Sequence, residues 1–230
     1  MTPRTSPLIY AHRGASFEHP EMSREAYLAA VAEGADGFEC DLRLTKDGVI
    51  LCWHDASLKR VADCDLVIAD STYSEIRAAY PVLRIEELIE IALEYHKGLA
   101  LETKHPVPSH GAVERELLKV LASYQSRLVA AQIDVAIMSF SWFAIARLRR
   151  THWNTVYLAA HRWFYLVNLG RSIGPSVSMV KHLHKIKIDH RQVFAWTANS
   201  EEQIKLCQAK GVDVMMTDRP AFARTILESA

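Results

Sequence analysis

Short apolar runs alternate with longer amphipathic segments along most of this chain. The first runs, residues 9–11, 37–44 and 49–53, are short and bounded by polar or glycine-containing turns, which predicts strands. From residue 85 onward, apolar residues at helical spacing alternate with further strand-like runs. Such alternation predicts a parallel sheet joined by right-handed helical crossovers, an α/β fold. We expect strands at 98–104, 135–140, 155–159, 192–196 and 213–217 and helices at 85–92, 113–121, 142–150 and 201–210, while 176–183 is ambiguous.

The segments between the first strands carry clear punctuation. A helix is expected from Pro20 and Glu21 to Gly34, because proline favours a helix start and glycine a helix end. Residues 46–48 predict a tight turn with Gly48 at positive φ. Residues 56–81 are polar and irregular apart from a short helix expected at 71–79.

Charged residues gather where the predicted strands end. Residues two apart in a strand share a face, so Glu39 and Asp41 point the same way and Cys40 points oppositely. Two carboxylates on one face repel each other unless a positive group lies between them, and hard oxygen ligands favour a divalent cation such as Mg²⁺ or Ca²⁺. Glu102 and Lys104 share a face in the same way on a later strand. The strand-like run 49–53 is followed by His54, so three predicted strands end in charged or titratable side chains, which indicates one polar pocket.

Composition excludes some functions. The 230 residues include 27 basic and 27 acidic ones, so no net charge attracts nucleic acid or anionic membrane. No apolar run reaches membrane-spanning length, and the first predicted strand begins near Leu8, so only seven residues precede it. The four cysteines lack C-x-x-C spacing and predict reduced, buried thiols. We therefore expect a single-domain cytoplasmic protein with a small-molecule substrate and no nucleic-acid partner, its oligomeric state left open.

A set of motifs in this order resembles the glycerophosphodiester phosphodiesterase family and extends over nearly the whole chain. The motifs are His12-Arg13-Gly14, Pro20-Glu21, Glu39-x-Asp41, Thr45-Lys46-Asp47-Gly48, His54-Asp55, Glu102-x-Lys104, Trp196-Thr197-x-Asn199 and Thr217-Asp218-Arg219-Pro220. With about eight predicted strands, the resemblance favours a TIM-type (β/α)8 barrel over 1–230, with an abbreviated insertion at approximately 56–84 after the second strand region. An open doubly wound sheet is the alternative, but it lacks support from a glycine-rich phosphate loop. The proposed residues also follow strands, and barrel enzymes carry their chemistry at the carboxyl ends of their strands.

The resemblance implies metal-dependent hydrolysis of glycerophosphodiesters to glycerol 3-phosphate and an alcohol. It implies that His12 and His54 divide the acid and base roles, with neither role assigned to either histidine. One divalent cation, Mg²⁺ or Ca²⁺, held by Glu39, Asp41 and Glu102, would bind a phosphate oxygen. We expect Arg13 and Lys104 to bind phosphate. Phe140 and Trp196 are candidates to line the substrate pocket, with packing at the barrel top as the alternative.

Other interpretations stay open. Met22 and Ser23 stand where the family usually carries Asn and Thr, which removes one amide from the loop. A lysophospholipase D or phospholipase C-like lyase would use the same acids and histidines, and the aromatic segment 161–166 would then form an acyl-chain wall; a buried helix face is the competing interpretation of that segment. A non-catalytic phosphate-ligand binding protein is the third possibility. Asp218 is expected to cap the last helix rather than to act as a catalytic acid.

Overall fold

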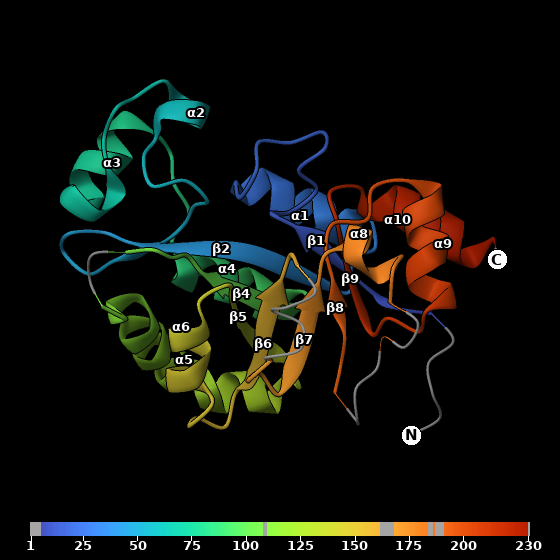
Figure 1. The fold of residues 1–230 in the computed structure, drawn as a ribbon. Helices are drawn as coiled ribbons and strands as arrows, with labels where there is room; N and C mark the ends of the chain where they lie inside the picture. Colours follow the sequence, from blue (N-terminus) through green and yellow to red (C-terminus); the bar gives the residue numbers. More distant parts are fainter. Residues whose placement is uncertain (1–5, 108–109, 162–167, 184–185, 187–190, 230) are drawn as a thin grey trace.

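Eight parallel strands form a nearly closed barrel in the computed structural model, which describes residues 6–107, 110–161, 168–183, 186 and 191–229 (Figure 1). The order around the sheet is β7-β6-β5-β4-β2-β1-β9-β8, and parallel bridges Ile173–Val193 and Ser176–Trp196 bring its two ends together. An extra strand, β3, pairs antiparallel with β2. The strands are β1 (Leu8–His12), β2 (Gly37–Leu44), β3 (Ile50–Cys52), β4 (Gly98–Thr103), β5 (Val135–Ser139), β6 (Asn154–Ala159), β7 (Ser172–Pro175), β8 (Phe194–Ala195) and β9 (Val214–Thr217). The predicted TIM-type barrel is confirmed.

Helices pack on the outer face of the barrel, against β1, β2, β4, β5 and β9 among other strands. The helices are α1 (Arg24–Ala32), α2 (Lys59–Ala62), α3 (Tyr73–Ala79), α4 (Ile85–Glu94), α5 (Ala112–Ala130), α6 (Trp142–Leu148), α8 (Val177–Val180), α9 (Glu201–Ala209) and α10 (Pro220–Glu228), with a 3-10 turn η1 (Ile68–Asp70). Of the part of the chain described here, no helix is long and apolar enough to span a bilayer.

Three sequence predictions need correction. The first helix begins at Arg24 rather than at Pro20, because the Ser23 side chain accepts from the backbone N–H of Ala26 and caps it. Met22, just before this cap, is buried and has φ of 55°, a left-handed conformation that a helix does not contain. The ambiguous segment 176–183 contains the short helix α8, and the strand β7 before it was not predicted. Asp218 does not cap α10, whose cap residue is Arg219.

Side chains inside the barrel lie in layers. Tyr10, Phe194 and Val214 belong to an apolar cluster inside the barrel, whereas Ile9 and Met215, on the alternate face, pack toward the helices. Gly98 has no room for a side chain, because an added Cβ would overlap the hydroxyl of Tyr10. This apolar cluster fills the barrel interior below the polar side chains of a cavity at the carboxyl end of the barrel.

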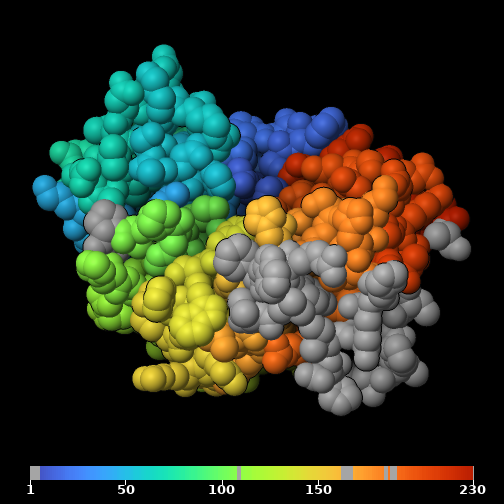
Figure 2. Space-filling model, viewed as in Figure 1, coloured from blue at the N-terminus to red at the C-terminus, as the bar shows by residue number. Residues whose placement is uncertain are grey.

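The connection between β3 and α4, residues 53–84, forms a lobe of its own. Its small core contains Trp53, Leu58, Ile68 and Ile76, and α2 and α3 flank it. The lobe stands apart from the barrel body, toward the end to which β6 and β7 point (Figure 1), and its teal surface projects as a knob in Figure 2. It therefore lies beside the carboxyl ends of the strands.

Candidate active site

A cavity of about 300 Å³ opens at the carboxyl end of the barrel. Eight of the residues that line it are predicted from the sequence: His12, Arg13, Glu39, His54, Glu102, Lys104, Phe140 and Trp196. Asp41 does not line it directly but contacts Lys104 and Arg13, which do. The structure thus brings together residues from six strands or the loops that follow them, β1, β2, β3, β4, β5 and β8.

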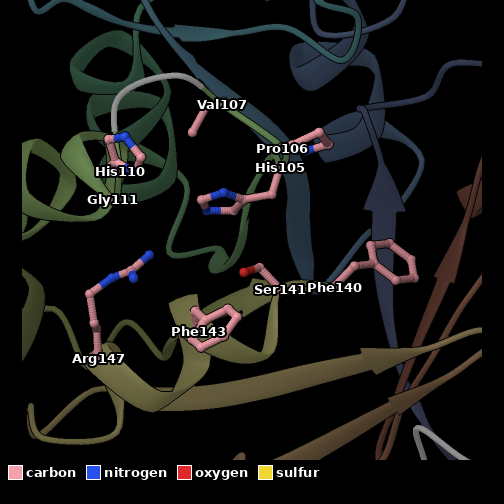
Figure 3. A pocket seen from close by; sticks show the side chains of 9 residues that line it. All are labelled: His105, Pro106, Val107, His110, Gly111, Phe140, Ser141, Phe143 and Arg147. Carbon is pink, nitrogen blue, oxygen red and sulfur yellow. The ribbon is translucent and has the colours of Figure 1, made fainter.

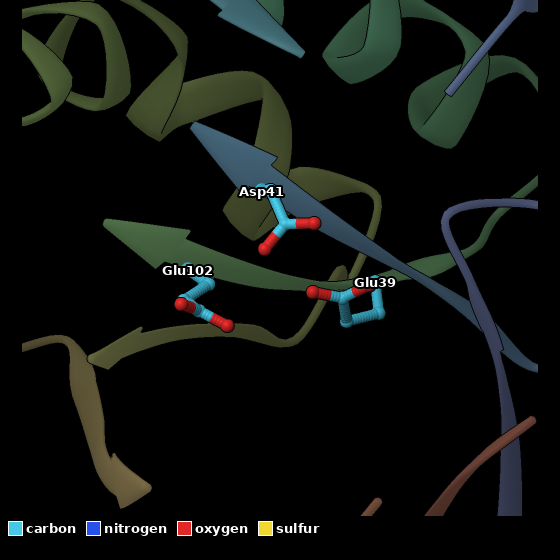
Figure 4. Close-up of side chains that lie close together, drawn as sticks. All are labelled: Glu39, Asp41 and Glu102. Atoms are coloured by element: carbon cyan, nitrogen blue, oxygen red, sulfur yellow. The ribbon is translucent and has the colours of Figure 1, made fainter. Parts of the chain in front are cut away.

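Three buried carboxylates lie side by side at one wall of the cavity (Figure 4). Glu39, Asp41 and Glu102 are 2%, 1% and 7% exposed, and each offers one oxygen within 4.8 Å of the others. Glu39 and Asp41 share a face of β2 as predicted, while Cys40 packs into the outer core. Because β2 continues past Asp41 to pair with β3, the two acids lie inside this strand rather than at its end.

The surroundings of the three acids shift their pKa values in different directions. Burial, and then the neighbouring Asp41, raise the pKa of Glu102 to about 7. Burial, with repulsion from Asp41 and Glu102, raises the pKa of Glu39 well above its ordinary value. Burial would also raise the pKa of Asp41, but Lys104 and Arg13 outweigh it and lower that pKa. The group is short of positive charge, and a cation would relieve this.

Two cationic side chains lie against these acids. Lys104 Nζ is 2.8 Å from Glu102 Oε1 and 3.2 Å from Asp41 Oδ1. Arg13 Nε is 2.9 Å from Asp41 Oδ2, and Arg13 Nη1 donates to Glu21 Oε2 at 3.2 Å. The backbone of Arg13 is left-handed, with φ of 61°, and its N–H donates to Glu39 Oε2 at 3.1 Å. This turn directs the Arg13 guanidinium back toward β2.

His12 is held by a hydrogen-bonded network. Its Nδ1 lies 2.6 Å from Asp218 Oδ1, and its Nε2 lies 3.9 Å from Glu39 Oε2. Asn199 Oδ1 accepts from the Asp218 backbone and from the Thr217 hydroxyl, so its amide nitrogen faces Asp218 Oδ2 and donates to it at 2.5 Å. Asp218 therefore acts as an acceptor, His12 Nδ1 carries the proton toward it, and Nε2 is the ring nitrogen directed to the cavity.

The structure gives Asp218 a different place from the predicted helix cap. Burial would raise its pKa, but the hydrogen bond and charge of His12 lower it, so the carboxylate form is favoured. The only sequence signal for this position was its place in the Thr217-Asp218-Arg219-Pro220 motif, because nothing local connects it to His12.

His54 has a parallel arrangement. Its Nδ1 lies 2.7 Å from Asp55 Oδ1, and its backbone carbonyl accepts two hydrogen bonds from Arg43, at 3.0 and 2.9 Å. Burial is the main cause that lowers the pKa of His54, which favours the neutral ring. The other oxygen of Asp55, Oδ2, accepts a hydrogen bond from Arg60 of α2, a contact that the sequence did not predict.

An aromatic pair borders the other side of the cavity. Phe140 and Trp196 meet edge to face with ring centroids 5.2 Å apart, and Trp196 Nε1 donates to the Gly174 carbonyl at 2.9 Å. A second pocket lies beyond Phe140, lined among others by His105, Ser141, Phe143 and Arg147 (Figure 3). The aromatic segment 161–166, for which an acyl-chain wall and a buried helix face are the alternatives, lies outside the described part of the chain except for His161.

The acidic group fits a hard divalent cation. Among the described residues, Asp41 Oδ2 is buried and makes no well-aligned hydrogen bond, although it lies 2.9 Å from Arg13 Nε. Fully ionised, the three carboxylates would carry three negative charges against the two positive charges of Arg13 and Lys104; the raised pKa values of Glu39 and Glu102 reflect this excess, which a bound cation would neutralise. Carboxylate oxygens with an excess of negative charge are the ligands that Mg²⁺ and Ca²⁺ prefer.

Comparisons with known proteins point to one family. The model of the glycerophosphoryl diester phosphodiesterase family matches residues 12–222. The chain is 30% identical over 255 residues to the probable glycerophosphodiester phosphodiesterase 1 of Mycobacterium tuberculosis, covering 96% of this chain and 93% of that protein. It is 27% identical over 243 residues to a glycerophosphodiester phosphodiesterase of Bacillus altitudinis, and the match covers 96% of this chain and 98% of that protein.

Solved structures share the fold. A phosphodiesterase of Oleispira antarctica, solved with its product sn-glycerol-3-phosphate, matches with a TM-score of 0.85 and 22% identity over 97% of both chains. The glycerophosphodiester phosphodiesterase of Thermotoga maritima matches with a TM-score of 0.80 and 21% identity, over 96% of this chain and 98% of that one.

Proposed function

Because this chain belongs to the glycerophosphoryl diester phosphodiesterase family, we propose that it hydrolyses glycerophosphodiesters to sn-glycerol 3-phosphate and an alcohol. The single observation that supports this most is the buried group Glu39, Asp41 and Glu102 beside two histidines and two cations in one cavity. The Oleispira antarctica relative, solved with sn-glycerol-3-phosphate, supports the same product.

In this proposal Glu39, Asp41 and Glu102 hold one divalent cation, Mg²⁺ or Ca²⁺. When bound, the cation supplies positive charge that stabilises the phosphate oxygens in the transition state. Arg13 and Lys104 add positive charge at the same wall and orient the diester phosphate. Phe140 and Trp196 border the side on which the organic part of the substrate lies.

The two histidines carry the proton transfers. One accepts, at its cavity-facing nitrogen, the proton of the attacking oxygen, which belongs to water or to the substrate's own glycerol hydroxyl, as the new P–O bond forms; if the glycerol hydroxyl attacks, water then opens the cyclic phosphate to give glycerol 3-phosphate. The other donates a proton to the leaving alcohol oxygen as the old P–O bond breaks, so protons balance over the reaction. Asp218 and Asp55 each accept from the opposite ring nitrogen, which sets the tautomer and the direction of each ring.

The four free cysteines among the described residues support the cytoplasm as the compartment.

The test is hydrolysis of glycerophosphocholine, glycerophosphoethanolamine and a lysophospholipid after chelation and readdition of Mg²⁺, Ca²⁺ or Mn²⁺. We expect metal-restored release of glycerol 3-phosphate from the water-soluble diesters. Turnover of the lysophospholipid alone would instead support a lysophospholipase D, and tight binding without turnover would support a phosphate-ligand binding protein.

The metal site has its own test. Glu39→Gln is expected to lower both metal affinity, measured by titration calorimetry, and hydrolysis. Glu90→Gln is the control, since Glu90 lies on the surface and pairs with Arg127. A folded Glu39→Gln protein with unchanged metal affinity and turnover would show that the acids have been assigned wrongly.

A further inference from the structure

A chain of ion pairs connects the lobe of residues 53–84 to both sides of the candidate active site. Its centre is Arg60 of α2, which contacts two carboxylates that are far apart in the sequence. Arg60 Nε donates to Asp55 Oδ2 at 2.5 Å. The two terminal nitrogens of Arg60 donate to the two carboxylate oxygens of Glu21, Nη1 to Oε2 at 3.2 Å and Nη2 to Oε1. One guanidinium therefore joins the loop after β3 to the loop before α1.

Each of these carboxylates also contacts a residue of the cavity. Asp55 uses its other oxygen, Oδ1, to hold His54 Nδ1 at 2.7 Å. Glu21 Oε2 also accepts from Arg13 Nη1 at 3.2 Å, and Arg13 in turn lies against Asp41. The orientation of His54 and that of Arg13 thus depend on carboxylates that share one partner.

We propose that Arg60 is a positioning residue for the hydrolysis proposed above, acting on His54 through Asp55 and on Arg13 through Glu21. The inference rests on that proposed function, because it concerns the same reaction. Arg60 lines no part of the cavity, so its effect is transmitted through the two carboxylates.

The geometry requires an arginine. A guanidinium is a planar fork whose nitrogens reach two carboxylates in different directions, whereas a lysine ammonium is a single point charge. A lysine ammonium can contact two carboxylates, but it cannot donate to both oxygens of Glu21 and to Asp55 from fixed directions as the three guanidinium nitrogens do. The side chain of Arg60 is half exposed, and exposed ion pairs contribute little to global stability, so the effect falls on the site more than on the fold.

The experiment compares Arg60→Ala and Arg60→Lys with Lys59→Ala, a matched control on the same helix. Lys59 pairs with Asp63 and Asp65 away from the cavity. We expect Arg60→Ala to lower kcat/KM by about 10- to 100-fold, through a lower kcat from a misdirected His54 and a higher KM from a displaced Arg13. Arg60→Lys is expected to restore part of this loss, and Lys59→Ala to behave as the wild type with melting temperatures similar throughout.

Chemical rescue separates positioning from a structural role. Added guanidinium ion, well below denaturing concentration, is expected to restore part of the activity of Arg60→Ala, because the missing group is half exposed and can be replaced from solution. An active wild type with Arg60→Ala equal to Lys59→Ala would overturn the inference and leave the function standing. If Arg60→Ala lost activity together with a clear drop in melting temperature, and guanidinium restored no activity, the role of Arg60 would be structural and the inference would also be overturned. A wild type inactive on every glycerophosphodiester would instead remove the proposed function, and the inference with it.

Discussion

Asp218→Asn tests how the orientation of His12 contributes to the reaction. Asparagine has the shape of aspartate but carries an amide nitrogen in place of one acceptor oxygen. Asn199 donates to Asp218 Oδ2 at 2.5 Å, and its own orientation is fixed by two donors at Oδ1. The new amide must therefore face either the Asn199 donor, which repels it, or His12 Nδ1, which would then have to give up its proton. The second arrangement moves the proton to Nε2, the nitrogen directed toward the cavity.

The expected magnitude follows from the hydrogen bond that is lost. A hydrogen bond to a charged group contributes about 1.5–3 kcal/mol, and a change of about 1.4 kcal/mol in the barrier is a tenfold change in rate. We therefore expect Asp218→Asn to lower kcat by about 10- to 150-fold. KM should change little, since Asp218 does not line the cavity.

The assay is release of glycerol 3-phosphate under steady-state conditions, with folding checked by circular dichroism and thermal unfolding. Asp36→Asn is the control: Asp36 Oδ2 accepts from the Ile9 backbone near the opposite end of β1 and from Arg224, and an asparagine oxygen can accept from both donors. A folded Asp218→Asn enzyme whose kcat lies within twofold of the control would refute the reasoning.

Three further substitutions are predicted together. Gly14→Ala should lower the free energy of unfolding by about 1–3 kcal/mol in a denaturant titration, because φ is 82° there and an added Cβ would lie 2.7 Å from Ala26. Gly48→Ala is the control, since Gly48 has a similar φ but no atom within 4 Å of an added Cβ, so the difference between the two variants measures the cost of the steric overlap. Glu114→Gln should cost about 1–3 kcal/mol at neutral pH, since buried Glu114 lies 2.5 Å from His105 Nε2. Burial would raise the pKa of Glu114, but His105 outweighs it, so the pKa is lower in the folded protein than in the unfolded chain. The stabilisation is therefore fully present above the unfolded pKa of about 4.3 and is lost as the pH falls through the folded-state pKa. Equal loss of stability in acid for the wild type and Glu114→Gln would contradict this. Phe140→Ala should raise KM severalfold with little change in kcat or melting temperature, and an unchanged KM would remove Phe140 from the substrate site.

The elements that the sequence predicted well are those with a strong local period. Residues 85–94 place their apolar side chains at helical spacing, and the structure has α4 there. The strand period in 37–44 predicted correctly that Glu39 and Asp41 share a face and that Cys40 points to the opposite one, which the structure packs into the outer core. Such faces depend only on the twofold repeat of a strand, which a short stretch of sequence contains in full.

Short or irregular elements were missed for a physical reason. Strand β7 has four residues, among them glycine and proline, and carries no readable period. The start of α1 was placed too early because Pro20 resembles a helix start, whereas Met22 in a left-handed conformation and the Ser23 cap delay it. Local preference is a weak guide where hydrogen bonds from other parts of the chain hold the backbone, as the Met22 N–H is held by the Arg13 carbonyl.

By itself, the sequence determined the alternating α/β plan, the faces of the strands and the residue types that gather at their carboxyl ends. Only the tertiary structure decided which of them meet. His12 and Asp218 are 206 positions apart and come together because the barrel places β9 beside β1. Arg60 and Glu21, 39 positions apart, meet because the lobe of residues 53–84 lies beside the loop before α1. A local pattern records the direction of a side chain from its own strand or helix, whereas its partner depends on the neighbour order of the strands and the paths of the loops, which the whole packed chain determines.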